Sequence, residues 1–297
     1  MATQPRQAVI VLGMHRSGTS ATAGTAVRLG LLKPSTMLAP AADNPSGFYE
    51  SLPVAGLNHL LLRAAGCQWH DCLSFDLGTL NSTVLTAAYE SAIRILRTEF
   101  GDGPGYVMKD PRLCLTLPIW IQALHAMGDK ISILLVVRHP VEVTRSLFRR
   151  DRLPESAMAA VWLHHLLEAE RLSRGLPRAV IFYDELPRNW RDCMMRAGEV
   201  ASINWPNAIG GMECGIDRYL DGSFRHHTAA EWDTVPGVPV LADLVSAATR
   251  VVRSADPALA EPSAHMALDL IRIRFQDWRS AMSVPAEDCR MKLAARH

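Results

Sequence analysis

The sequence predicts a three-layer α/β fold, in which a central parallel sheet lies between layers of helices. Short apolar runs of strand length alternate with helical patterns along the 297 residues. Such alternation is typical of parallel sheets joined by right-handed crossovers. The first apolar run also ends in a glycine-bounded loop that leads directly into a helical pattern, which is a second sign of this fold class.

Each element is predicted from hydrophobic periodicity and from the positions of Pro and Gly. Strand signals lie at 8–12, 105–108, 131–137 and 179–183. Helical patterns cover 18–31, 52–65, 82–100, 114–127, 140–150, 155–174, 186–202, 239–254 and 263–281. We expect one domain over 1–297, with the helices of 239–297 forming its C-terminal part.

Two segments interrupt the alternation of strands and helices. Residues 33–53 contain four prolines, so we expect an ordered loop after the first helix. Residues 203–238 are rich in Gly, Pro and aromatic side chains. Long irregular segments often serve as lids over binding sites, so 203–238 is a candidate lid or nucleotide loop.

The loop after the first strand has the spacing of a P-loop, with four residues between Gly13 and Gly18. Amides at a helix N-terminus and the helix dipole favour a phosphate there. The lysine that follows the second glycine of a P-loop is replaced by Thr19. Because that lysine contacts the β- and γ-phosphates of a nucleoside triphosphate, its absence disfavours ATP with magnesium. A P-loop-type fold that holds another 5′-phosphate group is expected.

A second anion-binding pair follows the strand at 131–137. Arg138 comes directly after this strand, and Pro140 suits the first position of the next helix. Ser146 then falls in the second turn of that helix, where it and Arg138 are placed to bind one anion. An arginine paired with a surface carboxylate is the alternative interpretation of Arg138.

Together these two segments resemble the superfamily of sulfotransferases that use 3′-phosphoadenosine-5′-phosphosulfate (PAPS). The residues from Gly13 to Ser20 are similar to the 5′-phosphosulfate loop of that superfamily, and Arg138 with Ser146 is similar to its 3′-phosphate clamp. Three further stretches resemble bacterial members: Asn-Pro-Ser-Gly-Phe-Tyr-Glu at 44–50, Lys-Asp-Pro-Arg at 109–112 and Phe-Tyr-Asp-Glu-Leu at 182–186. The resemblance covers residues 8–190.

The resemblance implies PAPS as the donor, 3′-phosphoadenosine 5′-phosphate (PAP) as the product, and no metal. It assigns donor binding to Arg16, Ser17, Gly18, Thr19, Ser20, Arg138, Ser146, Tyr183 and, in the late loop, Arg225. The fold gives independent support, because ligands of such sheets bind beyond the carboxyl ends of the strands. Arg16 follows the first predicted strand, Lys109 the second and Arg138 the third, and Tyr183 stands at the end of the fourth.

Sulfuryl transfer resembles phosphoryl transfer, so cationic side chains must stabilise charge on the donor. Arg16 and the loop amides suit the 5′-phosphosulfate. Lys109 or Arg112 is expected at the bridging oxygen or on the acceptor side. An ion pair at the strand end, with Asp110 or Asp184, is the alternative for these two cations.

The acceptor hydroxyl also needs a general base. Glu50 is the first candidate, because resembling bacterial proteins have a glutamate at this place. Histidine is used by other relatives, which makes His15 and His70 the further candidates. For Glu50, an N-cap partner of the following helix is the structural alternative.

The acceptor is expected to be a carbohydrate hydroxyl, because bacterial relatives with this loop look like glycan modifiers. Another alcohol or a phenol ranks second. The candidate acceptor contacts are Asn44, Phe48, Tyr49, Trp69, His70 and Arg112. For the aromatic members, a place in the core is the alternative. Arg145, Arg149, Arg150 and Arg152 are interpreted as a solvated helix face.

Composition limits the partners and the compartment. A formal net charge of +1 argues against a nucleic-acid partner or a polybasic membrane surface. No apolar run approaches the ~20 residues of a membrane span, and no apolar signal region is present at the N-terminus, so a cytoplasmic protein is expected. The six cysteines form no Cys-x-x-Cys pair, which disfavours a zinc site or a disulfide framework. The oligomeric state stays open.

Two other functions compete with sulfuryl transfer. A P-loop kinase for a small molecule would use Asp110 on the metal side, although Thr19 replaces the lysine it needs. A nucleotide-binding protein without catalytic activity is the second alternative.

Overall fold

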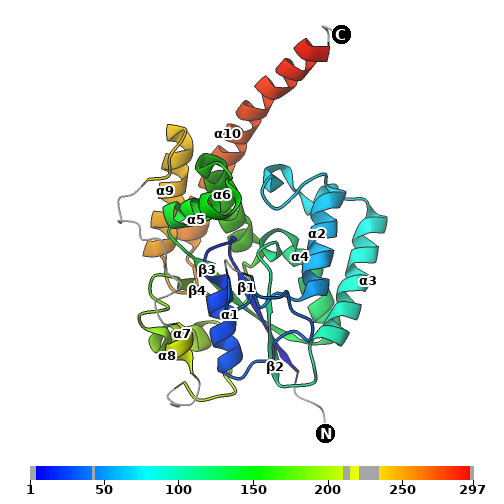
Figure 1. Ribbon diagram of the computed structural model, residues 1–297, viewed down its shortest axis with the longest axis vertical. Helices are drawn as coiled ribbons and strands as arrows, with labels where there is room; N and C mark the ends of the chain where they lie inside the picture. Colours follow the sequence, from blue (N-terminus) through cyan, green and yellow to red (C-terminus); the bar gives the residue numbers. More distant parts are fainter. Residues whose placement is uncertain (1–4, 42–43, 210–214, 221–233, 295–297) are drawn as a thin grey trace.

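The four predicted strands form one parallel sheet. The structure is a computed structural model that describes residues 5–41, 44–209, 215–220 and 234–294, and the side chains of the last helix only as far as 282 (Figure 1). The strands are β1 (Gln7–Leu12), β2 (Gly105–Lys109), β3 (Lys130–Val137) and β4 (Arg178–Phe182), in the order β2-β1-β3-β4. Helices flank this sheet, which confirms the predicted α/β fold.

Every predicted helix is present, most of them within two residues of the predicted ends. The longer helices are α1 (Thr19–Arg28), α2 (Leu52–Ala64), α3 (Ser82–Glu99), α4 (Leu113–Met127), α5 (Pro140–Asp151), α6 (Glu155–Leu172), α7 (Trp190–Val200), α9 (Pro239–Ser254) and α10 (Pro262–Ala294). Three short elements were not predicted: η1 (Cys72–Ser74), η2 (Leu77–Thr79) and α8 (Ile216–Tyr219).

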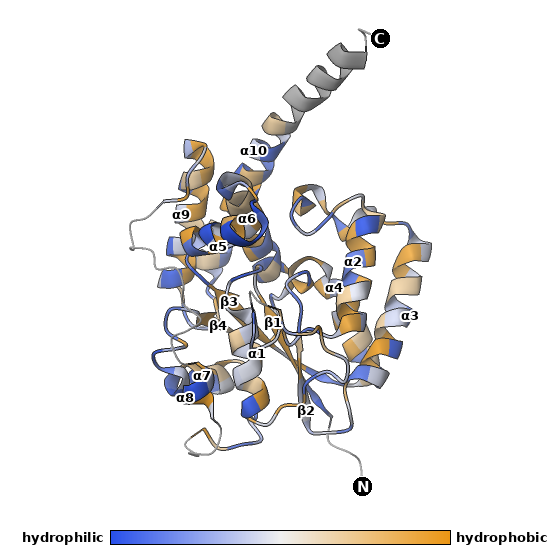
Figure 2. Ribbon diagram, viewed as in Figure 1, coloured by the Kyte–Doolittle hydropathy of each residue, from blue (hydrophilic) through white to orange (hydrophobic). Residues whose placement is uncertain are grey.

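The three predicted layers follow from the period of two along the strands. Alternate residues of a strand face opposite sides of a sheet. In β1, Ala8, Ile10 and Leu12 belong to one buried cluster, whereas Val9 and Val11 belong to another. The first cluster is shared with α2 to α6, α9 and α10, and the second with α1, α7 and α8. Figure 2 shows the result, with apolar strands at the centre of the molecule.

The strand order places a crevice beside β1. From β1 the chain goes to β2 on one side, and from β2 it crosses to β3 on the other side. Ligands of open α/β sheets bind outside the carboxyl ends of the strands, at the point where the strand order reverses. The phosphate loop (residues 13–18) leaves β1 there, and Arg138 follows β3 at the same edge.

The largest differences from the predicted boundaries occur at three helix ends. Helix α1 stops at Arg28, before Gly30, whose φ of 99° lies in the left-handed region. Helix α7 begins only at Trp190, because Asn189 caps it by accepting a hydrogen bond from the amide of Asp192. Helix α10 extends to Ala294, beyond the predicted end at 281.

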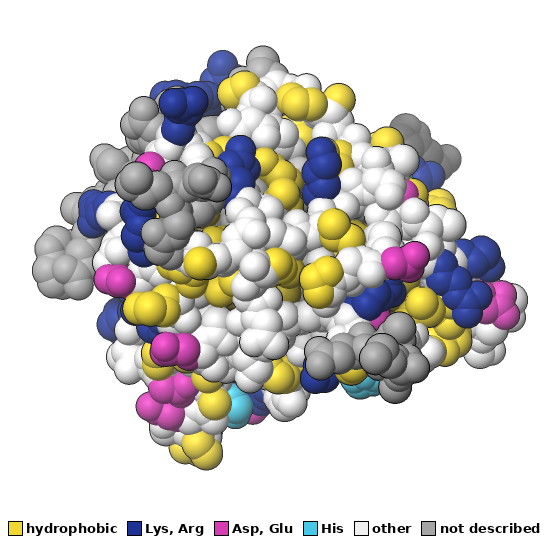
Figure 3. Space-filling view, turned by 90° about the horizontal axis from the view of Figure 1, so that it is seen from below, with side chains coloured by type: hydrophobic (Ala, Val, Ile, Leu, Met, Phe, Trp, Pro, Cys, Tyr) yellow, Lys and Arg dark blue, Asp and Glu magenta, His cyan; other side chains and the backbone are white. Residues whose placement is uncertain are grey.

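Part of the predicted lid lies within the described residues. Of 203–238, the structure describes 203–209, 215–220 and 234–238, and Arg225 lies outside the described residues. Within the described chain, no helix combines the length and the apolar character needed to cross a bilayer. On the face seen from below, the basic and acidic side chains of the described residues are interspersed (Figure 3).

Candidate functional site

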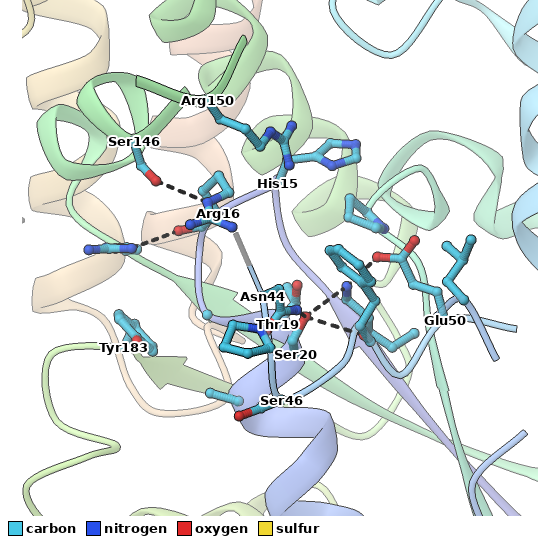
Figure 4. Close-up of a pocket in the computed structure, with 18 of the residues that line it drawn as sticks. His15, Arg16, Thr19, Ser20, Asn44, Ser46, Glu50, Ser146, Arg150 and Tyr183 are labelled. Atoms are coloured by element: carbon cyan, nitrogen blue, oxygen red, sulfur yellow. Dashed lines mark hydrogen bonds and ion pairs between the residues drawn. The ribbon is translucent and has the colours of Figure 1, made fainter. Parts of the chain in front are cut away.

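A cavity of about 1060 Å³ lies at the carboxyl edge of the sheet. Its wall is made by the phosphate loop, Leu38 and the segment 44–50, the ends of β2 and β3, one face of α5, and single residues from elsewhere (Figure 4). Five of the lining side chains are Arg or Lys and one is a carboxylate: Arg16, Lys109, Arg138, Arg149 and Arg150 against Glu50. The cavity therefore favours an anionic ligand.

The phosphate loop is built on two glycines that no other residue can replace without strain. Gly13 has a φ of 149°, and its amide donates a hydrogen bond to the buried thiol of Cys114 at 3.2 Å. Gly18 has a φ of 90°, and an added Cβ would lie 2.0 Å from the ring of Tyr183. The loop can therefore pass directly beneath Tyr183.

The loop opens on the cavity where α1 begins. Gly18 is the N-cap of α1, and Gly18, Thr19 and Ser20 line the cavity. The first amides of a helix have no acceptor within the helix, so they are available to an anion. Ser17 is buried behind this wall, and its hydroxyl has no hydrogen-bond partner among the described residues.

Arg16 links the phosphate loop to α5. Its backbone has a φ of 66°, and its Nε donates to the Ser146 hydroxyl at 2.9 Å. In turn, Arg138 Nη1 donates to the carbonyl of Arg16 at 3.0 Å. The structure thus brings the predicted loop and the predicted clamp into direct contact, and both line one cavity. Ser146 bonds to Arg16, a contact that the sequence did not indicate.

Arg138 is held in place by groups on two sides. Its Nε donates to Glu142 Oε2 at 2.8 Å, one helical turn further along the chain, and both residues are buried. The guanidinium also lies over the ring of Tyr183, 4.8 Å from its centroid. A carboxylate partner was the predicted alternative for Arg138, but this partner is buried and leaves the cation on the cavity wall. Glu142 therefore acts as a support for Arg138.

Glu50 and Lys109 form a buried ion pair on the opposite wall. Lys109 Nζ lies 2.5 Å from Glu50 Oε1, and both side chains line the cavity. The predicted capping role of Glu50 is wrong, because Ser51 caps α2 by accepting a hydrogen bond from the amide of Val54. The predicted alternative for Lys109 is wrong as well, since its partner is Glu50. Asp184 pairs instead with Arg253.

Burial raises the pKa of Glu50, and the nearby Asp110 raises it further. Lys109 and Arg112 oppose this rise through their positive charges. A carboxylate with a raised pKa that faces a cavity suits proton transfer near neutral pH.

The hydroxyl of Ser20 joins the phosphate loop to this wall. It donates to the carbonyl of Phe48 at 3.2 Å and accepts from Lys109 Nζ at 3.3 Å. Asn44 Nδ2 reaches the same hydroxyl at 3.4 Å and donates to the carbonyl of Gly47 at 2.8 Å. The segment 44–48 is thereby fixed against the first turn of α1.

The third wall contains His15, Trp69 and Arg150. The rings of His15 and Trp69 are 4.4 Å apart, and the Arg150 guanidinium lies 5.6 Å from the Trp69 centroid. Burial lowers the pKa of His15 well below its usual value, and Arg112 and other nearby groups lower it further. His15 is therefore neutral at pH 7. Its Nε2 is buried without a hydrogen-bond partner among the described residues.

Some predicted acceptor residues lie away from the cavity wall. Tyr49 turns toward α1, where its hydroxyl accepts a hydrogen bond from Arg28 at 2.9 Å. His70 packs beside Trp69, which does line the cavity together with Asn44 and Phe48. Arg112 pairs with Asp110 at 2.6 Å, as its alternative interpretation predicted.

The sequence did not indicate several cavity residues. Tyr219 lies on α8, and its hydroxyl donates to the carbonyl of Ser20 at 3.0 Å. It fits because Gly24 has no side chain: a Cβ there would lie 2.1 Å from the Tyr219 oxygen. No motif surrounds Tyr219, so no signal was available.

Arg149 and Arg150 were interpreted as solvated, but helical spacing places both near Ser146, at i+3 and i+4.

Comparisons with known proteins match the chain only at the level of structure. No family model and no curated protein matches the sequence. The chain is similar to the sulfotransferase domain of the olefin synthase from Synechococcus PCC 7002, with 17% identity, a TM-score of 0.41, and coverage of 92% of this chain and 97% of that one. It is also similar to the sulfotransferase domain of the curacin biosynthetic pathway, with 14% identity, a TM-score of 0.38, and coverage of 91% and 99%.

Proposed function

We propose that this protein is a sulfotransferase that moves a sulfuryl group from PAPS to an acceptor hydroxyl, with a carbohydrate as the first choice of acceptor. The observation that carries the proposal is one cavity lined by two neighbouring sets of anion-binding residues. The phosphate loop is one set, and Arg138 with Tyr183, which contact that loop, is the other. A nucleotide with phosphate groups at both its 5′ and 3′ positions fits this arrangement, because each set offers cationic or amide donors to one group.

The donor residues suit PAPS better than a magnesium-bound triphosphate. Thr19 stands where a kinase would have its lysine, and Arg16 supplies the charge in the loop. Asp110, the metal-side acid that a kinase would need, is fully buried and held by Arg112. It does not line the cavity. These features support the sulfotransferase over the kinase.

Each residue of the site has a separate role in the in-line transfer. PAPS, when bound, supplies the sulfuryl group and leaves as PAP. Glu50 accepts the proton of the acceptor hydroxyl as the new oxygen–sulfur bond forms and the bond to the PAP oxygen breaks. Lys109, Arg16 and the amides of the loop stabilise the charge that develops on the transferred group and on the leaving oxygen. Phe48 and Trp69 offer apolar faces to a sugar ring.

Thermal unfolding with two nucleotides tests the donor. PAP should raise the Tm strongly, because a ligand that binds only the folded state stabilises it, whereas ATP with Mg²⁺ should have little effect. The Arg138→Gln variant should lose most of the response to PAP. A rise with ATP and Mg²⁺ alone would support a kinase, and no rise with either nucleotide would refute a nucleotide-dependent enzyme.

A second experiment tests the reaction. Incubation with sulfur-labelled PAPS and a panel of sugars, glycolipids, alcohols and phenols should transfer label to at least one hydroxyl compound. Labelling of sugars before phenols is the expected order. Preferred labelling of phenols or simple alcohols would contradict the carbohydrate acceptor and leave the sulfotransferase intact.

A further inference from the structure

The cavity is also lined by residues to which no donor-binding role is assigned, among them Arg149 and Arg150. Arg16, Arg138 and Tyr183 lie on the side proposed for the nucleotide. Arg150 lies next to His15, on the other side of Arg16 from Tyr183 (Figure 4). The wall around Arg150 is therefore available to the second substrate.

Arg150 is a fixed cation over an aromatic ring. Its guanidinium is bound to the neighbouring carboxylate of Asp151 at 2.7 Å and lies over Trp69. Trp69 is in turn held against His15. Because the guanidinium is planar and is supported by Asp151 and Trp69, its orientation at the cavity wall is restricted.

Arg149 adds a second cation to the cavity lining. It forms no hydrogen bond or ion pair with another described residue. The lining carboxylate, Glu50, is already neutralised by Lys109. The positive charge of Arg149 thus has no ion-pair partner among the described residues, and it attracts anions to the cavity.

We propose that the acceptor carries an acidic group, a carboxylate, phosphate or sulfate, which Arg149 and Arg150 bind while its hydroxyl faces Glu50. This inference rests on the proposed sulfotransferase function and narrows its acceptor to anionic ring alcohols. The ring of the acceptor lies between its acidic group and its hydroxyl, against the apolar faces of Trp69 and Phe48. Arg149 and Arg150 then determine specificity and orientation, and they take no part in the transfer itself.

Calorimetric titration of the PAP-saturated protein tests this acceptor class without any turnover. The probes are matched sets: glucose with glucuronate, glucose 6-phosphate and glucose 6-sulfate, and phenol with 4-hydroxybenzoate. In at least one set the acidic member should bind about tenfold or more tightly than the neutral one, which corresponds to about 1.4 kcal/mol. The difference among carboxylate, phosphate and sulfate identifies the preferred anion.

Two variants separate a specific site from general attraction. The double variant Arg149→Gln/Arg150→Gln should abolish the preference for the acidic probe and keep the PAP affinity within about twofold. Arg145→Gln removes the same charge from α5 at an exposed position that does not line the cavity, and it should keep the preference.

Each other outcome overturns the inference. Equal binding of neutral and acidic probes, or no binding of any probe, excludes an anionic acceptor site. A large loss of PAP affinity in the double variant would assign the two arginines to the nucleotide. If PAP fails to bind the unmodified protein, the proposed function itself is wrong, so the two failures are distinguishable.

Discussion

The two walls of the cavity contain the same kind of buried ion pair, used in opposite ways. At one wall, Arg138 and Glu142 pair at 2.8 Å, and only the arginine lines the cavity. At the other, Lys109 and Glu50 pair at 2.5 Å, and both partners line it. A buried pair by itself is weak evidence of function, since its Coulomb energy is offset by desolvation. The difference lies in which partner faces the ligand.

This contrast assigns distinct roles to two glutamates in similar ion pairs. Glu142 sits behind its cation and fixes the direction of a binding group. Glu50 faces the cavity, where a carboxylate of raised pKa can exchange a proton with a ligand. Glu142→Gln should therefore affect donor binding, whereas Glu50→Gln should affect the transfer step.

The largest effect is expected from Glu50→Gln. Loss of a general base should lower kcat by ~10²–10⁴-fold, because glutamine cannot accept the proton of the acceptor hydroxyl. The PAP dissociation constant should change little. Rates with labelled PAPS and calorimetry with PAP measure the two quantities. Near-normal turnover of the variant would remove Glu50 from the reaction.

The opposite pattern is expected at the Arg138 wall. Arg138→Gln should weaken PAP binding by about 10- to 100-fold, since it removes charge-assisted hydrogen bonds to a phosphate. Glu142→Gln should weaken binding in the same direction but by less, because the arginine stays and only its support loses charge. Calorimetry with PAP gives both values. A Glu142→Gln variant that loses turnover at saturating donor and keeps its PAP affinity would contradict the supporting role.

The pH dependence of the reaction provides a third test. Protonation of Glu50 should cause the acid limb of kcat, so activity should fall as the pH falls through the pKa of this group. Lys109 lowers that pKa. In Lys109→Gln the pKa of Glu50 should rise, and the acid limb should move to higher pH by roughly one unit. If the acid limb stays in place or moves to lower pH, the group that titrates in it is not the Glu50 of this ion pair.

The smallest effect is expected from His164 and His165, which do not line the cavity. Their titration changes folding stability at low pH, and so provides a control for loss of activity by acid unfolding. Burial lowers the pKa of His164 to about 3 and that of His165 to about 4. In the unfolded chain both titrate near 6.5, so below that pH the unfolded state binds more protons and folding stability decreases. Each histidine should cost about 1.4 kcal/mol per pH unit between pH 6.5 and its folded pKa.

Chemical denaturation at several pH values measures this slope. The His164→Gln variant should lose less stability than the unmodified protein between pH 7.5 and pH 5.5, by about 1.4 kcal/mol. The acid limb of kcat should not change in this variant. Parallel stability curves for the two proteins would show that His164 is not the group that titrates on unfolding.

Local sequence was sufficient for the elements and for placing the phosphate loop and the start of α5 at the same edge of the sheet. The strand at 131–137 was recognised from an apolar run, and Pro140 set the start of α5, so Ser146 could be placed in its second turn. Contacts between segments that lie far apart in the sequence could not be predicted in the same way. The pairing of Lys109 with Glu50 joins residues 59 positions apart, and neither neighbourhood contains a signal for the other.

The candidate acceptor residues also divide into those that line the cavity, as predicted, and those that do not. Trp69, Asn44 and Phe48 were identified because the motifs at 44–50 and the aromatic pair at 69–70 stood out. Tyr49 and His70 were included with them, but their neighbours turn both side chains away from the wall. The direction of a side chain depends on the backbone conformation at that residue. Tyr49 has a φ of 56°, which no periodic pattern encodes.

The sequence by itself determined the layered α/β fold, the lysine-free phosphate loop and the presence of Arg138 after a buried strand, because periodicity, glycine spacing and proline placement act over a few residues. Only the tertiary structure decided which partner each charge has: Arg16 with Ser146, Arg138 with Glu142, and Lys109 with Glu50. Electrostatic partners depend on distance in space, and the crossovers of a parallel sheet bring together residues that lie far apart along the chain.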